Sequence, residues 1–381
     1  MPAQARLEFD PDPTLPDSGF EIGWDHARRG LVPPVEHLAS KNPIYEGWVA
    51  GRAAFGRRTL RDTRHARNWL RLRTNAWLRG RAFDCVHVTP NYLAQIDSTH
   101  CPITREALTH ATGGPNDASV DRVNNDAGYA AGNLALISAR ANAAKAAHGW
   151  RGALASARRI EAEALASIDG LDAVQWSRLA VLISFATPLG HAEAACLPLV
   201  VLPPNRLRVL NAVQALQVLL TLQFTRPGYS KRIAELSGLF APGEVRQCFH
   251  LFAHTLLARR VAAGRLDEPS RLRQAMEDIW CDPLVNRRWQ RLSLRLDGHT
   301  CEDIVRRAAL RCLAGTQCRW LARGAATEGW ALEAQGYAAA PHFRSRRTSA
   351  TEPAPRWPAI PAANHTKEDV SCTTQRCVMA T

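Results

Sequence analysis

Asparagine and aspartate residues recur at short intervals between Asp121 and Asn142, in the part of the chain best equipped for chemistry. Their side chains carry oxygen atoms, which are the ligands that a hard divalent cation prefers. Residues 124–128, Asn-Asn-Asp-Ala-Gly, have the composition of a turn, because Asn and Asp tolerate positive φ and Gly has no Cβ. Residues 119–123 and Tyr129 are therefore expected to form a short hairpin around this turn.

The residues after this hairpin have the spacing of a helix. Those that would share one helical face are Leu134, Ile137, Ala141 and Ala144. A hairpin followed by a helix would bring Asp121, Asn133 and the first helical turn close together. Such an arrangement can gather ligands around one hard cation. The alternative is an Asn-rich hairpin that caps a helix and binds no metal.

The segment from about residue 101 to residue 146 resembles the HNH endonuclease family. The helix end of that family commonly reads Asn-Leu-x-Leu-Leu-Cys-x-x-Cys-Asn-x-x-Lys. At the same offsets this chain has Asn133, Leu134, Leu136, Ile137, Asn142 and Lys145. Upstream, residues 118–133 (ASVDRVNNDAGYAAGN) resemble the phage-type variant, in which Asp-Arg-Ile-Asp-Asn-x-x-Gly-Tyr precedes the Asn. The resemblance implies the ββα-metal fold, which binds one divalent ion and cleaves a phosphodiester bond.

The resemblance also implies roles for individual residues. Asp121 stands at or next to the place of the family's first His, the general base, and would serve as base or as a ligand of Mg²⁺ or Mn²⁺. Arg122 takes that place under a shift of one residue. Asn142 stands where many members have the last metal-binding His, and Asn133 would tie the loop together by hydrogen bonds. The basic residues that would contact phosphate, or else face solvent, are Arg122, Arg140 and Lys145.

Two features of the family have no counterpart in this sequence. Members with a structural zinc use two Cys-x-x-Cys pairs, because four thiolates complete a tetrahedral site. In this chain the four positions that hold the zinc-binding cysteines, called the knuckle positions below, are Cys101, Thr104, Ser138 and Ala141. No structural zinc is therefore expected, and Cys101 is predicted to be a core or turn residue. The motif His is also replaced, and an Asp is a weaker base than His by roughly 2.6 pKa units. The other candidate bases, none at the family offset, are His100, His110 and His148.

The charge of the chain favours a polyanionic partner. Lys and Arg number 48 against 35 Asp and Glu, which gives a formal net charge of +13, and most of the cations are Arg. Between residues 51 and 81 a predicted helix has one packing face, formed by Ala66, Trp69, Leu70, Arg73 and Trp77. The residues off that face that are predicted to contact nucleic acid, most simply DNA, are Arg57, Arg58, Arg61 and Arg64. The alternatives are a solvated helix face and a genome-wide preference for Arg.

The periodicity of the rest of the chain predicts a mainly α protein with disordered termini, in which the resemblance implies a small embedded ββα-metal module. We expect disorder at 1–20, a basic helical region at 21–81, the HNH-like module at 82–150, a helical domain at 151–337 and a disordered tail at 338–381. Helices are predicted at 153–168, 173–185, 206–224, 231–239, 242–263, 269–280, 283–294 and 301–323. No apolar stretch is long enough to span a bilayer, and irregularly spaced cysteines fit a cytoplasmic protein without a membrane partner.

Three functions remain open from the sequence. One is an assembly protein built on the helical half, in which the motif is incidental, and the other two involve nucleic acid. The first of these two is an HNH-type endonuclease that uses Mg²⁺ or Mn²⁺ to hydrolyse phosphodiester bonds in DNA. The second is a nucleic-acid-binding protein that keeps the HNH-like module as a scaffold and has lost catalysis. The replaced His and the replaced cysteines motivate the second hypothesis.

Overall fold

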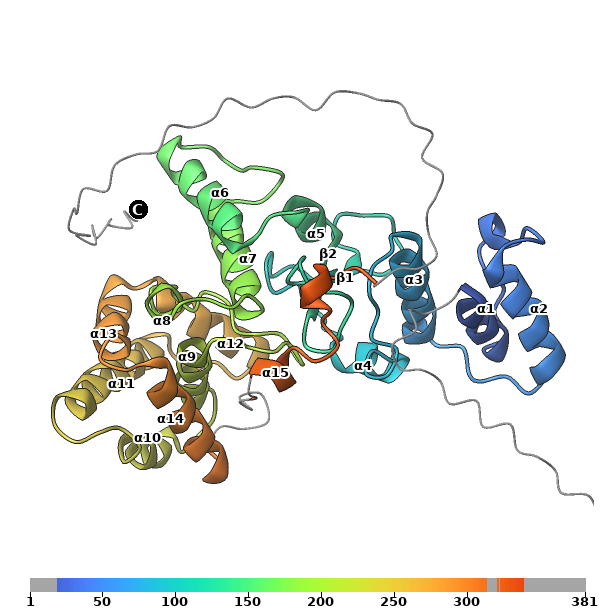
Figure 1. Cartoon of the computed structure of the whole chain (residues 1–381). Coiled ribbons are helices and arrows are strands. Elements are labelled where there is room, and N and C mark those ends of the chain that lie inside the picture. Colours follow the sequence, from blue (N-terminus) through green and yellow to red (C-terminus); the bar gives the residue numbers. More distant parts are fainter. Residues whose placement is uncertain (1–18, 314–320, 322, 339–381) are drawn as a thin grey trace, which may run out of the picture. The chain divides into compact units, whose positions relative to one another are not determined.

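Helices form most of the structure, as the sequence predicted, and the strands make one small antiparallel sheet (Figure 1). The computed structural model describes residues 19–313, 321 and 323–338. The predicted disordered start and tail lie outside the described residues, except for Gly19, Phe20 and Ala338. Gly19 and Phe20 begin the first helix, so the prediction of disorder up to residue 20 is wrong at its end. Within the described residues, no helix is long and apolar enough to cross a membrane.

Three helices precede the module: α1 (Gly19–Arg28), α2 (Pro43–Phe55) and α3 (Arg64–Leu78). Helices α1 and α2 pack closely, because Gly23 and Gly47 let each backbone approach the other, and a Cβ at either position would collide with a facing carbonyl. The Thr63 hydroxyl caps α3 by accepting a hydrogen bond from the amide of Ala66 at 3.1 Å. The predicted packing face of α3 is confirmed: Ala66, Trp69, Leu70 and Arg73 are buried and Trp77 is half-buried.

The module consists of α4 (Pro90–Gln95), β1 (Ala118–Arg122), β2 (Leu134–Ser138) and α5 (Ala139–Lys145). The strands pair antiparallel, with Asp121 opposite Ala135. The prediction of a helix from Leu134 is wrong, because residues 134–138 form a strand and Ser138 then caps a shorter helix. Tyr129 does not belong to the hairpin strands; it lies in the long connection and forms a parallel bridge with Phe83.

Strand β2 is buried on both faces. Ala135 and Ile137 belong to the large core shared with the C-terminal helices, whereas Leu134 packs in a second core with Trp69 and Tyr92. Because both faces of the strand pack against apolar residues, its sequence does not alternate apolar and polar residues. Because the module shares its core with the elements on either side, the predicted boundaries at residues 82 and 151 cross packed structure.

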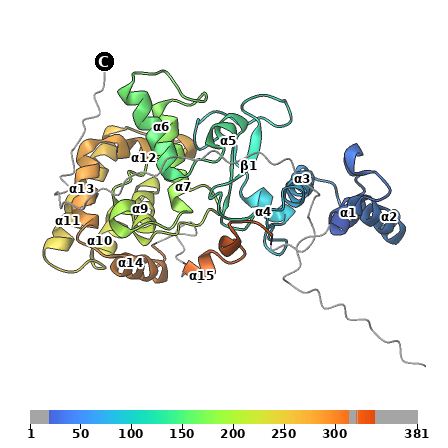
Figure 2. The same cartoon turned by 45° about the horizontal axis from the view of Figure 1, so that its top comes forward.

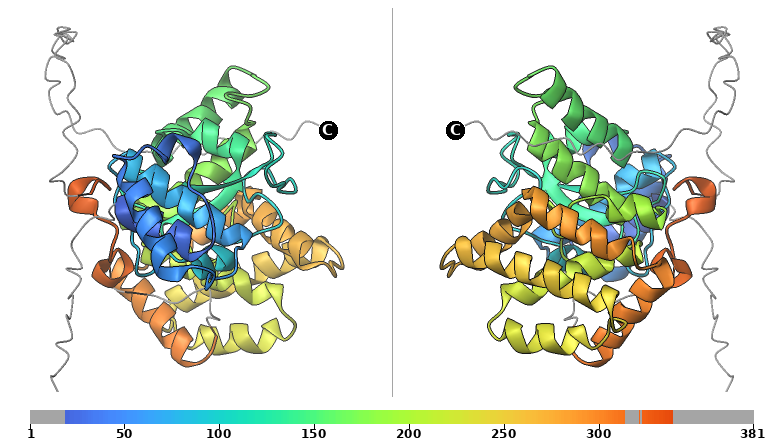
Figure 3. Two further views of the ribbon diagram at one scale, coloured as in Figure 1. Left: turned by 90° about the vertical axis from the view of Figure 1, so that its right-hand side faces the viewer. Right: turned by 90° about the vertical axis from the view of Figure 1, so that its left-hand side faces the viewer.

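The helices that follow the module pack against one another, several of them in pairs (Figures 2 and 3). They are α6 (Trp150–Ala162), α7 (Ala173–Phe185), α8 (His191–Ala195), α9 (Ala212–Leu222), α10 (Tyr229–Ser237), α11 (Glu244–Ala262), α12 (Pro269–Asp278), α13 (Pro283–Ser293), α14 (Gly298–Leu310) and α15 (Arg323–Ala326), with 3-10 turns at Gln223–Thr225, Ile279–Cys281 and Leu332–Ala334. A further 3-10 turn, Val35–His37, lies between α1 and α2. Helix α6 packs on α7, α9 on α14, and α11 on α13. The predicted helices at 206–224 and 301–323 are too long, since residues 206–211 and 311–313 are not helical.

Two tryptophans anchor these helices. Trp280 and Trp289 are fully buried and their rings meet edge to face, with centroids 5.7 Å apart. Each indole N–H is bonded, that of Trp280 to the hydroxyl of Thr221 at 3.1 Å and that of Trp289 to the carbonyl of Ala195 at 3.0 Å. Burial of such large rings is favourable because each polar N–H keeps a partner.

The last described segment returns to the module. The indole of Trp330, fully buried, donates to the carbonyl of Ala131 at 3.0 Å, and the amide of Gly128 donates to the carbonyl of Trp330 at 2.8 Å. Seven residues later, Tyr337 bridges with Arg81, whose guanidinium lies 3.8 Å from the centre of the tyrosine ring. Residues 330–337, predicted to belong to the helical domain, therefore pack on the module.

Candidate functional site

Lys145 lies at the centre of the ββα unit and is fully buried. Its ammonium group donates to the Asp121 carboxylate at 3.1 Å, to the Arg122 carbonyl at 2.7 Å and to the side-chain oxygen of Asn125 at 2.8 Å. An ammonium has three N–H donors, so this set of acceptors uses all of them. The sequence prediction that Lys145 contacts phosphate or faces solvent is therefore wrong, because the side chain has no exposed surface.

Asp121 is the charge partner of Lys145. It is 7% exposed, and both carboxylate oxygens lie 3.1 Å from the ammonium nitrogen. Burial raises the pKa of the Asp121 carboxyl, and Lys145 opposes that rise. Burial likewise lowers the pKa of the Lys145 ammonium, and Asp121 opposes that fall. Each group thus depends on the other to remain charged inside the protein.

Strand and helix geometry explain why these side chains meet. Ser119 and Asp121 are two residues apart on β1 and share one face, while Asn142 and Lys145 are three apart on α5 and share another. The two faces pair in order: Asn142 donates to the hydroxyl of Ser119 at 2.8 Å, and Lys145 donates to Asp121. Asn142 and Asp121 therefore lie on the facing sides of α5 and β1, and each is engaged by a protein side chain.

Asn133 organises the long loop between the strands, as the sequence predicted. The side chain is fully buried, and its oxygen accepts from the amide of Asn124 at 2.8 Å. Its amide group donates to the carbonyls of Asn124 and Gly128, each at 3.0 Å. All of these partners are backbone groups, so Asn133 stabilises the loop and takes no part in ligand contact.

The residues present do not fit a catalytic divalent cation. The carboxylate that would bind the ion is already neutralised by an ammonium at contact distance, and a second cation there would be repelled. No group of three or more His, Cys, Asp or Glu residues among the described positions could hold a metal. The three candidate bases, His100, His110 and His148, are exposed, and the ring of His148 packs on Trp176.

Packing and hydrogen bonds close the turn at the four knuckle positions. Cys101 is buried, as predicted, and its sulfur accepts from the amide of Ser138 at 3.3 Å. The Ser138 hydroxyl in turn accepts from the amide of Ala141 at 3.3 Å, which caps α5. Thr104 is also buried, and the guanidinium of Arg178 from α7 donates to the carbonyl of Ile103 at 3.1 Å. The contacts join both knuckle pairs without a metal.

Two further basic residues predicted to contact phosphate are engaged within the protein. Arg122 donates to the carbonyls of Asn125 at 3.2 Å and Ala127 at 2.8 Å, and it lies over the ring of Tyr129. Arg140 donates to the carboxylate of Glu106 at 2.8 Å. Both guanidinium groups therefore hold the loops around the sheet together.

The N-terminal arginines were expected on one helix, and the structure shows that they are not. Arg57, Arg58 and Arg61 are exposed in the connection between α2 and α3, residues 56–63, which we call the arginine loop. Among the described contacts, none of these three guanidinium groups has a hydrogen bond or ion pair. Arg64 differs, because it begins α3 and forms an ion pair with Asp97. The arginine loop thus presents three unpaired cations, and Arg64 presents a neutralised one.

Sequence reasoning missed two residues that complete the site. Asn125 was assigned to the turn, yet its side chain accepts from Lys145 and donates to the carbonyl of Ala146 at 3.0 Å. Ser119 was assigned to the hairpin, yet it binds Asn142. The signal available in the sequence was the alternation along β1, which places Ser119 on the face of Asp121. Comparisons with protein-family models, curated proteins and solved structures found no match to this chain.

Proposed function

We propose that this protein binds nucleic acid and that its HNH-like unit serves as a scaffold without catalysing cleavage. The observation that carries the proposal is the Lys145 ammonium, which is bonded to three oxygens at the centre of the ββα unit. The positive charge between β1 and α5 is thus the ammonium group of Lys145, a side chain of the protein itself. The oxygens of Asp121 and Asn125, which are suited to a divalent ion, are its acceptors.

Burial argues against a catalytic role for this pair. A general base must reach the water molecule or proton on which it acts, to within hydrogen-bond distance. Asp121 is almost fully enclosed, and Lys145 is fully enclosed. Removing either partner would leave an uncompensated buried charge, which is the usual property of a structural ion pair.

The arginine loop supports the nucleic-acid part of the proposal. Its three exposed guanidinium groups carry positive charge in a chain with a formal net charge of +13. Other arginines of the same region have partners inside the protein: Arg67 pairs with Asp62, and Arg73 pairs with Asp25 and stacks on Trp69. Arg57, Arg58 and Arg61 thus place three exposed cations within five residues of one loop, and Arg71 of α3 and Arg79 just after that helix are exposed as well. A planar guanidinium suits phosphate oxygens.

The proposal is tested by measuring binding and cleavage separately. Fluorescence anisotropy with labelled duplex DNA should give the same affinity in EDTA and in Mg²⁺ once ionic strength is matched. Affinity should fall as salt rises, because phosphate contacts release counterions. Plasmid incubated with Mg²⁺ or Mn²⁺ should remain uncut. Metal-dependent nicking that disappears in Asp121→Asn would favour the endonuclease instead, and absence of salt-sensitive binding would remove both functions.

A further inference from the structure

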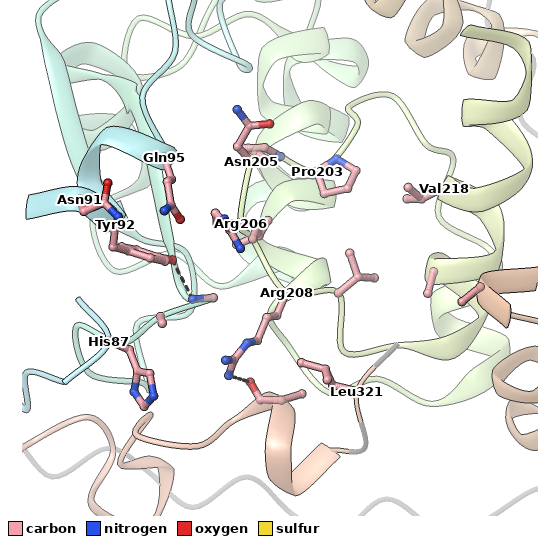
Figure 4. A pocket seen from close by; sticks show the side chains of 18 of the residues that line it. His87, Asn91, Tyr92, Gln95, Pro203, Asn205, Arg206, Arg208, Val218 and Leu321 are labelled. Atoms are coloured by element: carbon pink, nitrogen blue, oxygen red, sulfur yellow. Dashed lines mark hydrogen bonds between the residues drawn. The ribbon is translucent and has the colours of Figure 1, made fainter. Parts of the chain in front are cut away.

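A cleft of about 1410 Å³ opens beside the module (Figure 4). One wall is α4 with the residues just before it, the floor includes Ala131 and Gly132 at the end of the β1–β2 loop, and the opposite wall is the segment 203–209. The volume exceeds the range of roughly 300–1,000 Å³ that is typical of small-molecule sites. The cleft therefore has room for an extended ligand.

The two facing walls carry amide and guanidinium side chains among apolar residues such as Pro203, Pro204 and Leu207. Asn91 and Gln95 are four residues apart on α4 and are both exposed on the side of the cleft, opposite Asn205 and Arg206. Figure 4 shows Gln95 and Arg206 pointing toward one another. The described lining residues include Arg206 and Arg208 but no Asp or Glu, and His87, which also lines the cleft, pairs with Asp84 at 3.0 Å. Such a surface favours an anion that also offers hydrogen-bonding groups to amides.

Arg206 and Arg208 have different roles in this cleft. Arg208 is structural: its amide donates to the carbonyl of Gly132 at 3.0 Å, and its guanidinium donates to the carbonyl of Ala326 at 2.6 Å. Gly132 has a φ of 89°, and any Cβ there would collide with the side chain of Arg208. The Gly132 amide also donates to the hydroxyl of Tyr92 at 2.8 Å, which fixes the floor of the cleft to α4.

The side chain of Arg206, unlike that of Arg208, does not hold parts of the protein together. Its side chain is exposed, and among the described contacts its guanidinium has neither a hydrogen bond nor an ion pair. Its backbone has a φ of 64°, in the left-handed region that Gly occupies readily and Arg does not. A long cationic side chain at a backbone position better suited to Gly is a local cost, and such costs are often found at binding sites.

We propose that this cleft binds a nucleotide unit, with its phosphate on Arg206 and its sugar or base edges on the amides of Asn91, Gln95 and Asn205. The inference rests on the proposed nucleic-acid binding and adds a second contact region to the arginine loop. The same phosphate chemistry is offered by a single-stranded segment and by a free nucleotide. The experiment therefore includes both as probes.

The first test compares Arg206→Gly with a matched control. Gly relieves the left-handed backbone, so the thermal midpoint of this variant should equal or exceed that of the original protein. Its affinity for a short labelled oligothymidylate should fall about tenfold or more, since a charged hydrogen bond is lost. Arg158→Gln removes an exposed charge of α6 outside the cleft lining and should change affinity much less. Equal affinities for Arg206→Gly and the original protein would overturn the inference.

The second test locates the ligand by protection of a thiol. Cys312 is exposed and lines the cleft, whereas Cys281 is exposed and does not line it. Alkylation by iodoacetamide, read by peptide mass spectrometry, should slow at Cys312 and not at Cys281 when oligothymidylate is added. Protection by thymidine 5′-phosphate as well would identify a free-nucleotide site, and protection by the oligomer alone would identify a strand site. Duplex or oligomer binding without protection of Cys312 would refute the cleft while leaving the proposed function intact.

Discussion

The buried pair of Lys145 and Asp121 allows a quantitative prediction by a double-mutant cycle. Lys145→Met keeps most of the side-chain volume and removes the ammonium, so the Asp121 carboxylate stays buried without a counterion. Breaking a buried ion pair in this way costs about 3–5 kcal/mol. The reverse variant, Asp121→Leu, strands the ammonium and should cost a similar amount. In the double variant both charges are gone, and the loss should be far smaller than the sum of the two.

Hydrogen exchange of the β2 amides is the appropriate assay, since it reports the local opening free energy without requiring two-state unfolding of a large chain. A loss of about 3 kcal/mol corresponds to exchange roughly 100-fold faster, at 1.4 kcal/mol for each factor of ten. Arg158→Gln serves as a control, because it changes an exposed charge without touching the pair. Additive effects, or single-variant losses below about 1 kcal/mol, would show that the ammonium does not hold the ββα unit together.

Four other outcomes follow from the structure. In Lys145→Ala the oxygens of Asp121, Arg122 and Asn125 lose their cation, and Ca²⁺ or Mn²⁺ should raise the thermal midpoint of this variant more than that of the original protein. Replacing the three cations of the arginine loop by Gln should flatten the salt dependence of duplex binding by about 2.7 in log–log slope, with an unchanged thermal midpoint. Hydrogen bonds from Thr109 and Thr112 lower the pKa of Asp117 to about 2, so the surrounding turn should be fully stabilised above pH 4 and lose that stabilisation as the pH falls toward 2, as read from exchange of its amides. Cysteine at the three knuckle positions that lack it should create a four-thiolate site that binds one zinc per chain by metal analysis, and no binding would contradict the alignment of those positions.

The burial of Lys145 is the part of the site that sequence reasoning could not reach. Lysine is almost never fully buried unless it is paired. Its pairing depends on β1 and α5 meeting face to face, although the loop 123–133 and strand β2 separate them in the chain. A solvent-exposed position was therefore the more reasonable expectation for Lys145. Asn133 was predictable for the opposite reason, because its partners are the backbone of the loop that it ends.

The wrong prediction of a helix where strand β2 forms has a comparable physical explanation. Its residues, Leu134–Ser138, are a short apolar run, and the run continues into α5 with helical spacing. A strand buried on both faces lacks the alternation that would separate it from a helix. The packing face of α3 was predicted correctly. One side of this helix faces water, so its apolar residues recur at helical spacing in the sequence. Arg57, Arg58 and Arg61 lie off the packing face, as predicted, but in a loop, because the helix end at Phe55 was missed although Gly56 follows it directly.

The bond between Ala131 and Trp330 has a consequence for how the protein is made. The two residues are 199 positions apart in the chain. A ribosome adding about 5–20 residues per second needs roughly 10–40 s to travel that distance. During this time the loop that ends at Asn133 is outside the ribosome without the indole that closes it. The ββα unit, although it is translated in the first half of the chain, is completed only when the last described segment emerges, and a protein shortened before Trp330 would never complete it.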